Sequence, residues 1–374
     1  MAMLRIIIKV FQIFCLIPFN YKTENVSNFL TIFSTCDSFW LIAHIILNIS
    51  LMAIGRFLHS EVFHAHYFVG HINDIIKFCI GILTVLVALI GRIAYRKSLA
   101  NIWAYFANRT SNGLNHCSPA IKKYCIKFWI YHIAIILIEY CVIRGIGFNH
   151  QWLYFWLSNI YPSTMCRLIH LCHILYIDYL NEEFEKLLGN LSNVNKLMEE
   201  LKEFRKPDDR FQLKLRENVS LLLSCKKQYS AIWSVMRTVN KLYAWVQVLN
   251  IANNFIQFSC DFYWAYMHFY KLLKIEGISA LVLCLIPSPL VLLMLLTAAE
   301  KFRTLGAKVG SMLHEIPKFD NPELYDIVYS FSMQVKQQPM QLLAYSLMKI
   351  DYSLTIRIVA GVASYMIIFI QLTS

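Results

Sequence analysis

Seven stretches of about 20 residues, each nearly free of charged side chains, divide this chain. A helix of about that length crosses the hydrocarbon core of a bilayer. The chain is 57% apolar and 16% charged, whereas soluble domains are roughly 45–50% apolar and about 25% charged. These features predict an all-α membrane protein with seven transmembrane helices. The spans are expected at residues 36–58, 73–94, 126–145, 152–178, 242–269, 277–299 and 352–373.

The placement of the basic residues predicts the orientation. The formal net charge is +12, which by itself would fit a nucleic-acid partner, but the basic residues lie beside the spans and no such partner is expected. Connections on the N-terminal side of the membrane carry 26 Lys and Arg residues, and those on the other side carry 2. Because basic loops stay in the cytoplasm, the N-terminus is expected inside and the C-terminus outside. A G-protein-coupled receptor has the opposite orientation, so this class is disfavoured.

No large soluble domain is expected. Apolar residues recur every three or four positions after span four, which predicts an amphipathic helix that continues this span into the cytoplasm. A second such helix rises into span five. Their apolar stripes need partners, either each other or neighbouring subunits. The expected division is 1–35 (cytoplasmic N-terminal segment), 36–178 (spans one to four), 179–241 (cytoplasmic helical anchor region), 242–299 (spans five and six), 300–351 (cytoplasmic segment leading to the last helix) and 352–374 (span seven).

Two shorter features interrupt this pattern. The N-terminus is similar to a signal peptide, but Lys9 breaks its apolar core, so a short helix at the membrane surface is expected. Pro287 and Pro289 in span six each remove a backbone donor, which predicts a kink or a local unwinding there.

Span five carries a stripe of polar and amphipathic side chains along one face. They are Asn250, Asn254, Gln257, Asp261, Trp264 and His268. Because polar groups avoid lipid, the stripe either bonds neighbouring helices or lines a hydrated cavity. Large rings and a carboxylate gather in the halves of spans three to five expected to lie outermost, as in small-molecule pockets. The candidate pocket residues are Glu139, Tyr140, Tyr154, Trp156, Gln257, Asp261 and Trp264.

No motif in the sequence predicts an enzyme. A nucleophile with a base, a phosphate-binding loop and a zinc-protease helix are all absent from the sequence. His64 and His66 are two residues apart, but only Glu61 is near enough to complete a site, so an ordinary loop is favoured over a metal site. We therefore expect neither a metal nor a cofactor.

The last span has two different faces. Ser364, Ile367 and Gln371 share one face with Ile368 beside them, and Tyr365, Met366 and Phe369 lie opposite. One interpretation is a buried helix whose Gln371 amide bonds a neighbour. The other is a pore built from several copies, with Gln371 near the mouth and the isoleucines as an apolar constriction.

This span resembles the carboxy-terminal signature of insect gustatory receptors, which is Thr-Tyr, five apolar residues and Gln-Phe. Here the pattern reads Ser364-Tyr365, five apolar residues and Gln371-Leu372, so the first and last positions differ. The place of the motif at the C-terminus, the chain length, the seven expected spans and the inside N-terminus extend the resemblance to the whole chain.

The resemblance implies a tetrameric, ligand-gated cation channel in the plasma membrane of gustatory sensory neurons. The last helix of each subunit would line one pore, with Gln371, Ser364 and Tyr365 matching the signature and Ile367 and Ile368 added from helical phase. Spans one to six would hold a small organic tastant, and aversive compounds form the family's largest group. The partners would be the bilayer and identical or related subunits. A G-protein-coupled type of chemoreceptor and a membrane transporter are the alternatives.

Overall fold

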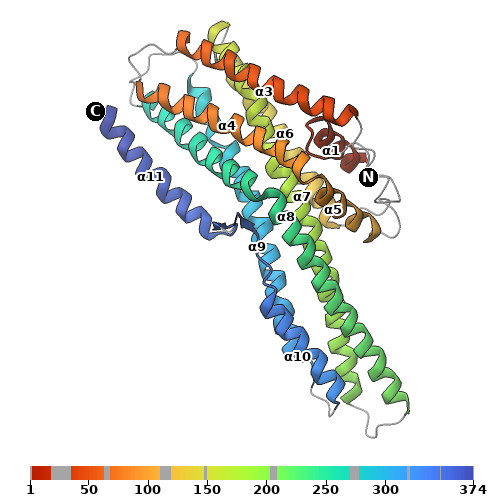
Figure 1. The fold of residues 1–374 in the computed structure, drawn as a ribbon. Coiled ribbons are helices and arrows are strands. Elements are labelled where there is room, and N and C mark those ends of the chain that lie inside the picture. Colours follow the sequence, from red (N-terminus) through yellow and green to blue (C-terminus); the bar gives the residue numbers. More distant parts are fainter. Residues whose placement is uncertain are drawn as a thin grey trace.

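The chain is almost entirely helical in the computed structural model, which describes residues 2–17, 35–62, 68–109, 119–146, 150–202, 209–269, 278–317, 321–345 and 347–373 (Figure 1). The described residues of the seven expected stretches are helical except Ile286 and Tyr352, which lie in turns. The α-helices are α1 (Ala2–Ile13), α3 (Thr35–Val62), α4 (Phe68–Ala94), α5 (Arg96–Arg109), α6 (Pro119–Ile146), α7 (His150–Lys202), α8 (Asp209–Phe269), α9 (Pro287–His314), α10 (Pro322–Gln337) and α11 (Ser353–Thr373).

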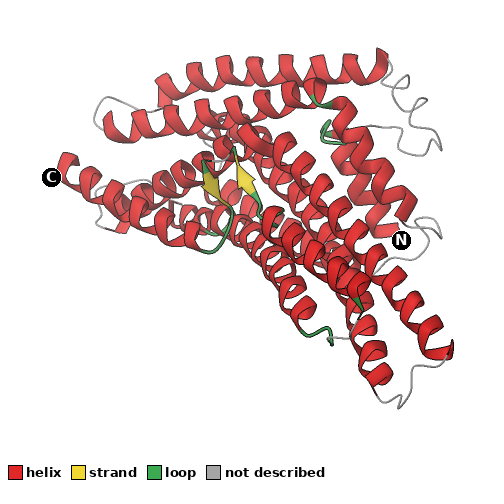
Figure 2. Ribbon diagram, turned by 60° about the horizontal axis from the view of Figure 1, so that its bottom comes forward, coloured by secondary structure: helices red, strands yellow, loops and turns green. Residues whose placement is uncertain are grey.

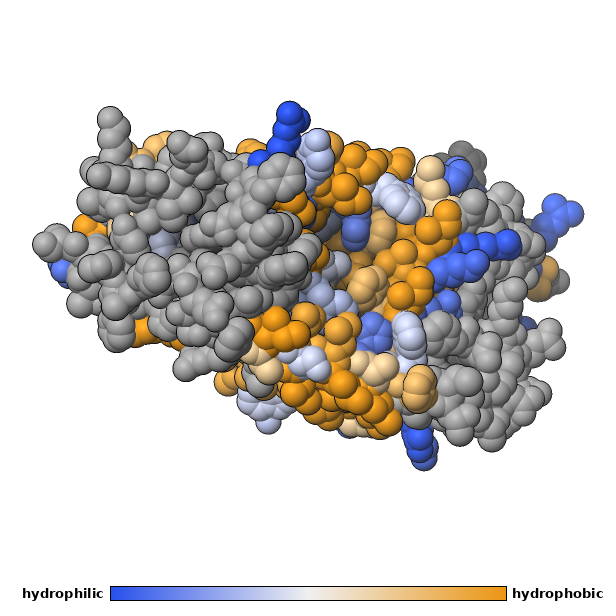
Figure 3. All heavy atoms as spheres, turned by 90° about the horizontal axis from the view of Figure 1, so that it is seen from above, coloured by the Kyte–Doolittle hydropathy of each residue, from blue (hydrophilic) through white to orange (hydrophobic). Residues whose placement is uncertain are grey.

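Four helical segments among the described residues are long and apolar enough to cross a bilayer. They are Asp74–Ala94, Pro119–Arg144, Val282–His314 and Ser353–Gln371, and Phe39–Leu51 is a shorter apolar stretch. The expected spans one, four and five are not among these four segments; the apolar parts of α7 and α8 contain polar side chains. Seen from above, the described surface is largely apolar with hydrophilic side chains among the apolar ones (Figure 3). On α6, Ile130 and Ile136 are 63% and 66% exposed, as lipid-facing side chains of a membrane protein are.

Two helices are far longer than a bilayer requires. α7 has 53 residues and α8 has 61, which corresponds to about 80 and 90 Å at 1.5 Å per residue. Figure 1 shows both helices running from the bundle of α3, α4 and α6 into a narrower lobe that they share with α9 and α10. We call this narrower part the lower lobe.

The apolar stripe of α7 is covered inside the chain. Leu187, Leu191 and Val194 are at most 1% exposed and belong to one continuous core with α8 and α9. Amides reinforce the contact: Asn181 Nδ2 donates to the carbonyl of Ala298 at 3.2 Å. The partners of these stripes are therefore helices of the same chain, chiefly α7 with α9 and α8.

The expected segment 300–351 contains structure that the sequence patterns did not indicate. α10 begins with Asn321, whose side chain accepts a hydrogen bond from the Leu324 backbone N–H at 2.9 Å, and with Pro322 in the first turn. Both choices favour a helix start. A hairpin of β1 (Leu343–Ala344) and β2 (Met348–Lys349) follows (Figure 2). Asn240 of α8 holds this hairpin by accepting from the Leu343 N–H at 3.3 Å.

The structure contains both the proline break expected in span six and the short helix expected at the N-terminus. Span six changes from the 3₁₀ helix η3 (Ile278–Leu285) to α9, which begins at Pro287, so the proline break is confirmed. α1 is a helix as expected, but its apolar face packs on protein. Phe11 is fully buried, and its ring meets that of Phe128 on α6 edge to face at 5.7 Å.

Candidate functional site

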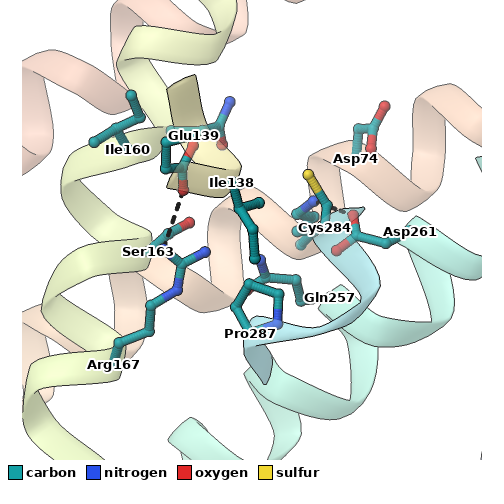
Figure 4. A pocket seen from close by; sticks show the side chains of 12 residues that line it. Asp74, Ile138, Glu139, Ile160, Ser163, Arg167, Gln257, Asp261, Cys284 and Pro287 are labelled. Carbon is teal, nitrogen blue, oxygen red and sulfur yellow. Dashed lines mark hydrogen bonds and ion pairs between the residues drawn. The ribbon is translucent and has the colours of Figure 1, made fainter. Parts of the chain in front are cut away.

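A cavity lies among α4, α6, α7, α8 and the break between η3 and α9. Its volume of about 50 Å³ is enough for several water molecules. Five of its twelve lining residues are acidic or basic: Asp74, Lys77, Glu139, Arg167 and Asp261. Figure 4 shows Glu139 and Arg167 on one side, and Asp74 and Asp261 on the other.

Two ion pairs, one at each wall of the cavity, connect neighbouring helices. Lys77 Nζ of α4 lies 2.8 Å from Asp261 Oδ1 of α8, and Arg167 of α7 lies 3.1 Å from Glu139 Oε1 of α6. All four side chains are at most 20% exposed. Buried charges are tolerated where they are paired and hydrogen-bonded. The pairs therefore hold four helices around a polar interior.

The third carboxylate of the cavity belongs to Asp74. Trp264 Nε1 donates a hydrogen bond to Asp74 Oδ1 at 3.3 Å. With three carboxylates against two cations, the lining carries one formal negative charge in excess. Asp261 is paired with Lys77 through Oδ1, and its Oδ2 has no hydrogen-bond partner among the described residues.

The polar stripe of α8 serves both purposes that its sequence suggested. Asn250 Nδ2 donates to the carbonyl of Cys166 at 2.9 Å, and Asn254 Nδ2 lies 2.5 Å from His170 Nε2, so these amides bond α8 to α7. Further along the helix, Gln257 and Asp261 line the cavity. The stripe changes from interhelical bonding to cavity lining between Asn254 and Gln257.

The last helix, α11, has one packed face and one open face. Met366 and Phe369 are each 6% exposed and pack with Tyr263 and Trp264 of α8. Ile367 and Ile368 are 58% and 52% exposed. Ser364 and Gln371 are exposed on the same side as the isoleucines. The two faces expected from helical phase are therefore present.

The contact of α11 with α8 is close and aromatic. The rings of Tyr263 and Phe369 meet edge to face at 5.3 Å, and those of Phe255 and Tyr365 lie 6.2 Å apart. A Cβ atom on Gly361 would lie 3.0 Å from the Phe255 ring. The absence of a side chain at Gly361 therefore lets α11 approach the Phe255 ring closely.

The comparison with known families decides what kind of protein this is. The sequence model of a family described as 7tm Chemosensory receptor matches residues 4–373. The chain belongs to this receptor family. No curated protein sequence matches the chain.

The fold of this chemosensory receptor is similar to that of insect olfactory receptor OR5 from Machilis hrabei. The structure of OR5 in complex with eugenol has a TM-score of 0.69 and 10% sequence identity, and the match covers 99% of each chain. A second OR5 structure has a TM-score of 0.67 and 12% identity, covering 99% of this chain and 98% of OR5. At such low identity the likeness establishes the fold alone.

The receptor cavity gathers some of the pocket residues expected from the sequence. Glu139, Gln257 and Asp261 line it, and Trp264 adjoins it through Asp74. Tyr140 is 59% exposed and is not among the lining residues. Tyr154 and Trp156 lie on α7, but their side chains are outside the part that the structure describes, as is the side chain of His268 on α8.

Three charged lining residues were missed: Asp74, Lys77 and Arg167. A signal was present, since ionisable residues inside apolar spans mark functional sites by default. Of these three, Arg167 pairs with Glu139, which the sequence did predict as a pocket residue.

Within the described ranges, no group of three or more His, Cys, Asp or Glu side chains is arranged to hold a metal ion. The candidate pair His64 and His66 lies outside the described residues. The polar groups of the cavity are thus side chains that can bind a ligand by hydrogen bonds and charge.

Proposed function

We propose that this receptor is a gustatory receptor: a ligand-gated, non-selective cation channel of the plasma membrane, opened by a small organic tastant in the cavity. The observation that carries the proposal is the double role of α8. Asp261 lines the cavity, and Tyr263, two residues further on, contacts Phe369 of α11. A ligand that displaces α8 therefore acts directly on the last helix.

The pore is assigned to the open face of α11. Four copies around an axis would place Ser364, Ile367, Ile368 and Gln371 on the pore wall, with Tyr365 towards α8. The exposure of these isoleucines and of the Gln371 side chain supports this arrangement. Identical and related subunits both satisfy it, and the lower lobe would lie in the cytoplasm as the anchor, given the 26-to-2 distribution of basic residues.

An organic ligand is supported by the similar OR5 structure, which was solved in complex with eugenol. The preference for an aversive or bitter compound rests on the family resemblance alone. A ligand biases opening only by its differential affinity for the two states. A 100-fold preference for the open state supplies about 2.7 kcal/mol per site, and four sites add.

The test is electrical recording from cells that express the receptor, followed by recording from the purified protein in planar bilayers. Gln371→Glu adds a negative ring at the proposed mouth, so it should raise the preference for cations over anions or change rectification. Ile367→Ala should widen the constriction and increase ligand-free current.

Ile133→Ala on α6 is the matched control, because this isoleucine is 56% exposed and Ile367 is 58% exposed. It should leave selectivity and ligand-free current as in the wild type. Ligand currents whose selectivity is unchanged by Gln371→Glu, Ser364→Ala and Ile367→Ala would refute the pore assignment. Currents that require a G protein would refute the channel itself.

A further inference from the structure

The wall of the cavity formed by α4 and α8 carries more carboxylates than basic side chains among its described residues. Among the lining residues that the structure describes, Lys77 is the one basic residue of this wall, where it is bonded to Asp261 Oδ1 at 2.8 Å and is attracted to Asp74. At the opposite wall Arg167 and Glu139 neutralise each other. The excess negative charge of the lining is therefore located at the α4–α8 wall.

Asp261 presents an unused acceptor at this wall. Its side chain is 8% exposed, and its Oδ2 has no partner within the described part of the chain. An ionised carboxylate can accept about four hydrogen bonds, and a buried acceptor left unsatisfied is costly. A donor supplied by a ligand would remove that cost without displacing Lys77.

Apolar side chains separate the two charged walls. Figure 4 shows Ile138 and Pro287 between Arg167 and Asp261, with Ile160 on the α7 side. These side chains offer contacts to a compact hydrocarbon body, while Asn159, Ser163 and Gln257 also line the cavity and can bond a polar group of a ligand.

We infer that the cavity selects a protonated amine on a compact apolar body, with the ammonium group donating to Asp261 Oδ2 and the body lying against Ile138 and Pro287. This inference rests on the proposed role of the cavity as the ligand site. A neutral alcohol can also donate to Oδ2, but it brings no positive charge to the two carboxylates of the α4–α8 wall. A carboxylate ligand would be repelled by them.

The test measures binding to the purified receptor in detergent by isothermal titration calorimetry, so it does not depend on channel opening. The probes are 2-phenylethylamine, 2-phenylethanol and phenylacetate, which have similar bodies and are cationic, neutral and anionic at pH 7. The wild type should bind the amine at least about tenfold more tightly than the alcohol, as expected for one opposite charge in a partly buried site. It should bind phenylacetate least.

Two variants with opposite charge changes separate recognition from general damage. Asp261→Asn removes the negative charge and should abolish the preference for the amine. Lys77→Ala leaves two buried carboxylates without their cation and should strengthen amine binding by about tenfold. Neither variant should change the affinity for 2-phenylethanol by a comparable factor. A variant that merely loosens the fold would weaken the amine and the alcohol together.

The outcomes are distinct from those of the channel experiment. Equal or weaker binding of the amine than of the alcohol, or absence of amine binding to the wild type, would overturn the inference and leave the channel proposal standing. Loss of amine binding in Lys77→Ala would also overturn it. Amine binding with the expected variant effects, but without ligand currents, would support the inference and refute the channel.

Discussion

The ring of Phe369 on α11 lies edge to face with the ring of Tyr263 on α8, with their centroids 5.3 Å apart. Tyr263 follows Asp261 by two positions, so a residue that lines the cavity and a residue that holds the last helix are on the same turn of α8. This relationship links the candidate ligand site to the candidate pore with no intervening element.

Phe369→Ala should weaken the attachment of α11 to α8. Phe369 is 6% exposed, and truncating a buried phenylalanine costs about 3 kcal/mol or more. The thermal unfolding midpoint in detergent should fall, and the agonist concentration for half-maximal current should change. Ile356→Ala on the same helix, at a side chain that is 73% exposed, serves as the control and should leave the midpoint nearly unchanged.

Gly306→Ala should destabilise the lower lobe. A Cβ at position 306 would lie 2.7 Å from the Cβ of Met340, and such overpacking costs about 1–3 kcal/mol. Gly189→Ala on α7 is the matched control, because no atom lies within 4 Å of its added Cβ. There the substitution should stabilise the helix by about 0.5–1 kcal/mol. Equal shifts of the two unfolding midpoints would contradict the packing described for α9.

Removing one charge of the Arg167–Glu139 pair should lower the free energy of unfolding more than removing both charges. Arg167→Met or Glu139→Gln alone leaves a largely buried charge without its partner, at a cost of up to about 3–5 kcal/mol. The double variant should recover part of that loss, and the coupling is read from a double-mutant cycle of unfolding midpoints. For comparison, Glu199→Gln breaks the exposed pair with Lys202 and should change stability by less than about 1 kcal/mol.

Stability should decline in alkali partly through Cys225. Burial raises the pKa of this thiol from 9.0 to about 11. A group whose pKa is raised by folding contributes stability that is complete below its unfolded pKa and is lost as the pH rises through its folded pKa. Cys225→Ala should therefore lose less stability than the wild type between pH 9 and pH 11, as measured by thermal unfolding. Parallel curves for the two proteins would show that Cys225 does not contribute.

The helical periodicity of the sequence indicated much of the local structure. The regular spacing in the α7 and α8 segments predicted two amphipathic helices, and Pro287 predicted the break before α9. The same phase argument divided α11 into the face of Ile367 and the face of Phe369. These predictions worked because helix formation and the faces of a helix depend on neighbours three and four residues apart.

The hairpin of β1 and β2, the helix α10 and the part of α9 beyond residue 299 gave no comparable signal. The hairpin has two residues per strand, and it is held by Asn240, 103 residues earlier than its partner Leu343. Such an element owes its stability to a distant helix, so local propensity does not reveal it.

The sequence by itself determined that this is a helical membrane protein whose last helix has two different faces, one with Ser364 and Gln371 and one with Tyr365 and Phe369. Composition and periodicity suffice for this because they are local properties. Only the tertiary structure decided which charges meet. Lys77 reaches Asp261 across 184 residues, and Glu139 of α6 meets Arg167 of α7. The rotation and crossing of packed helices select these partners, and no spacing along the chain encodes that choice.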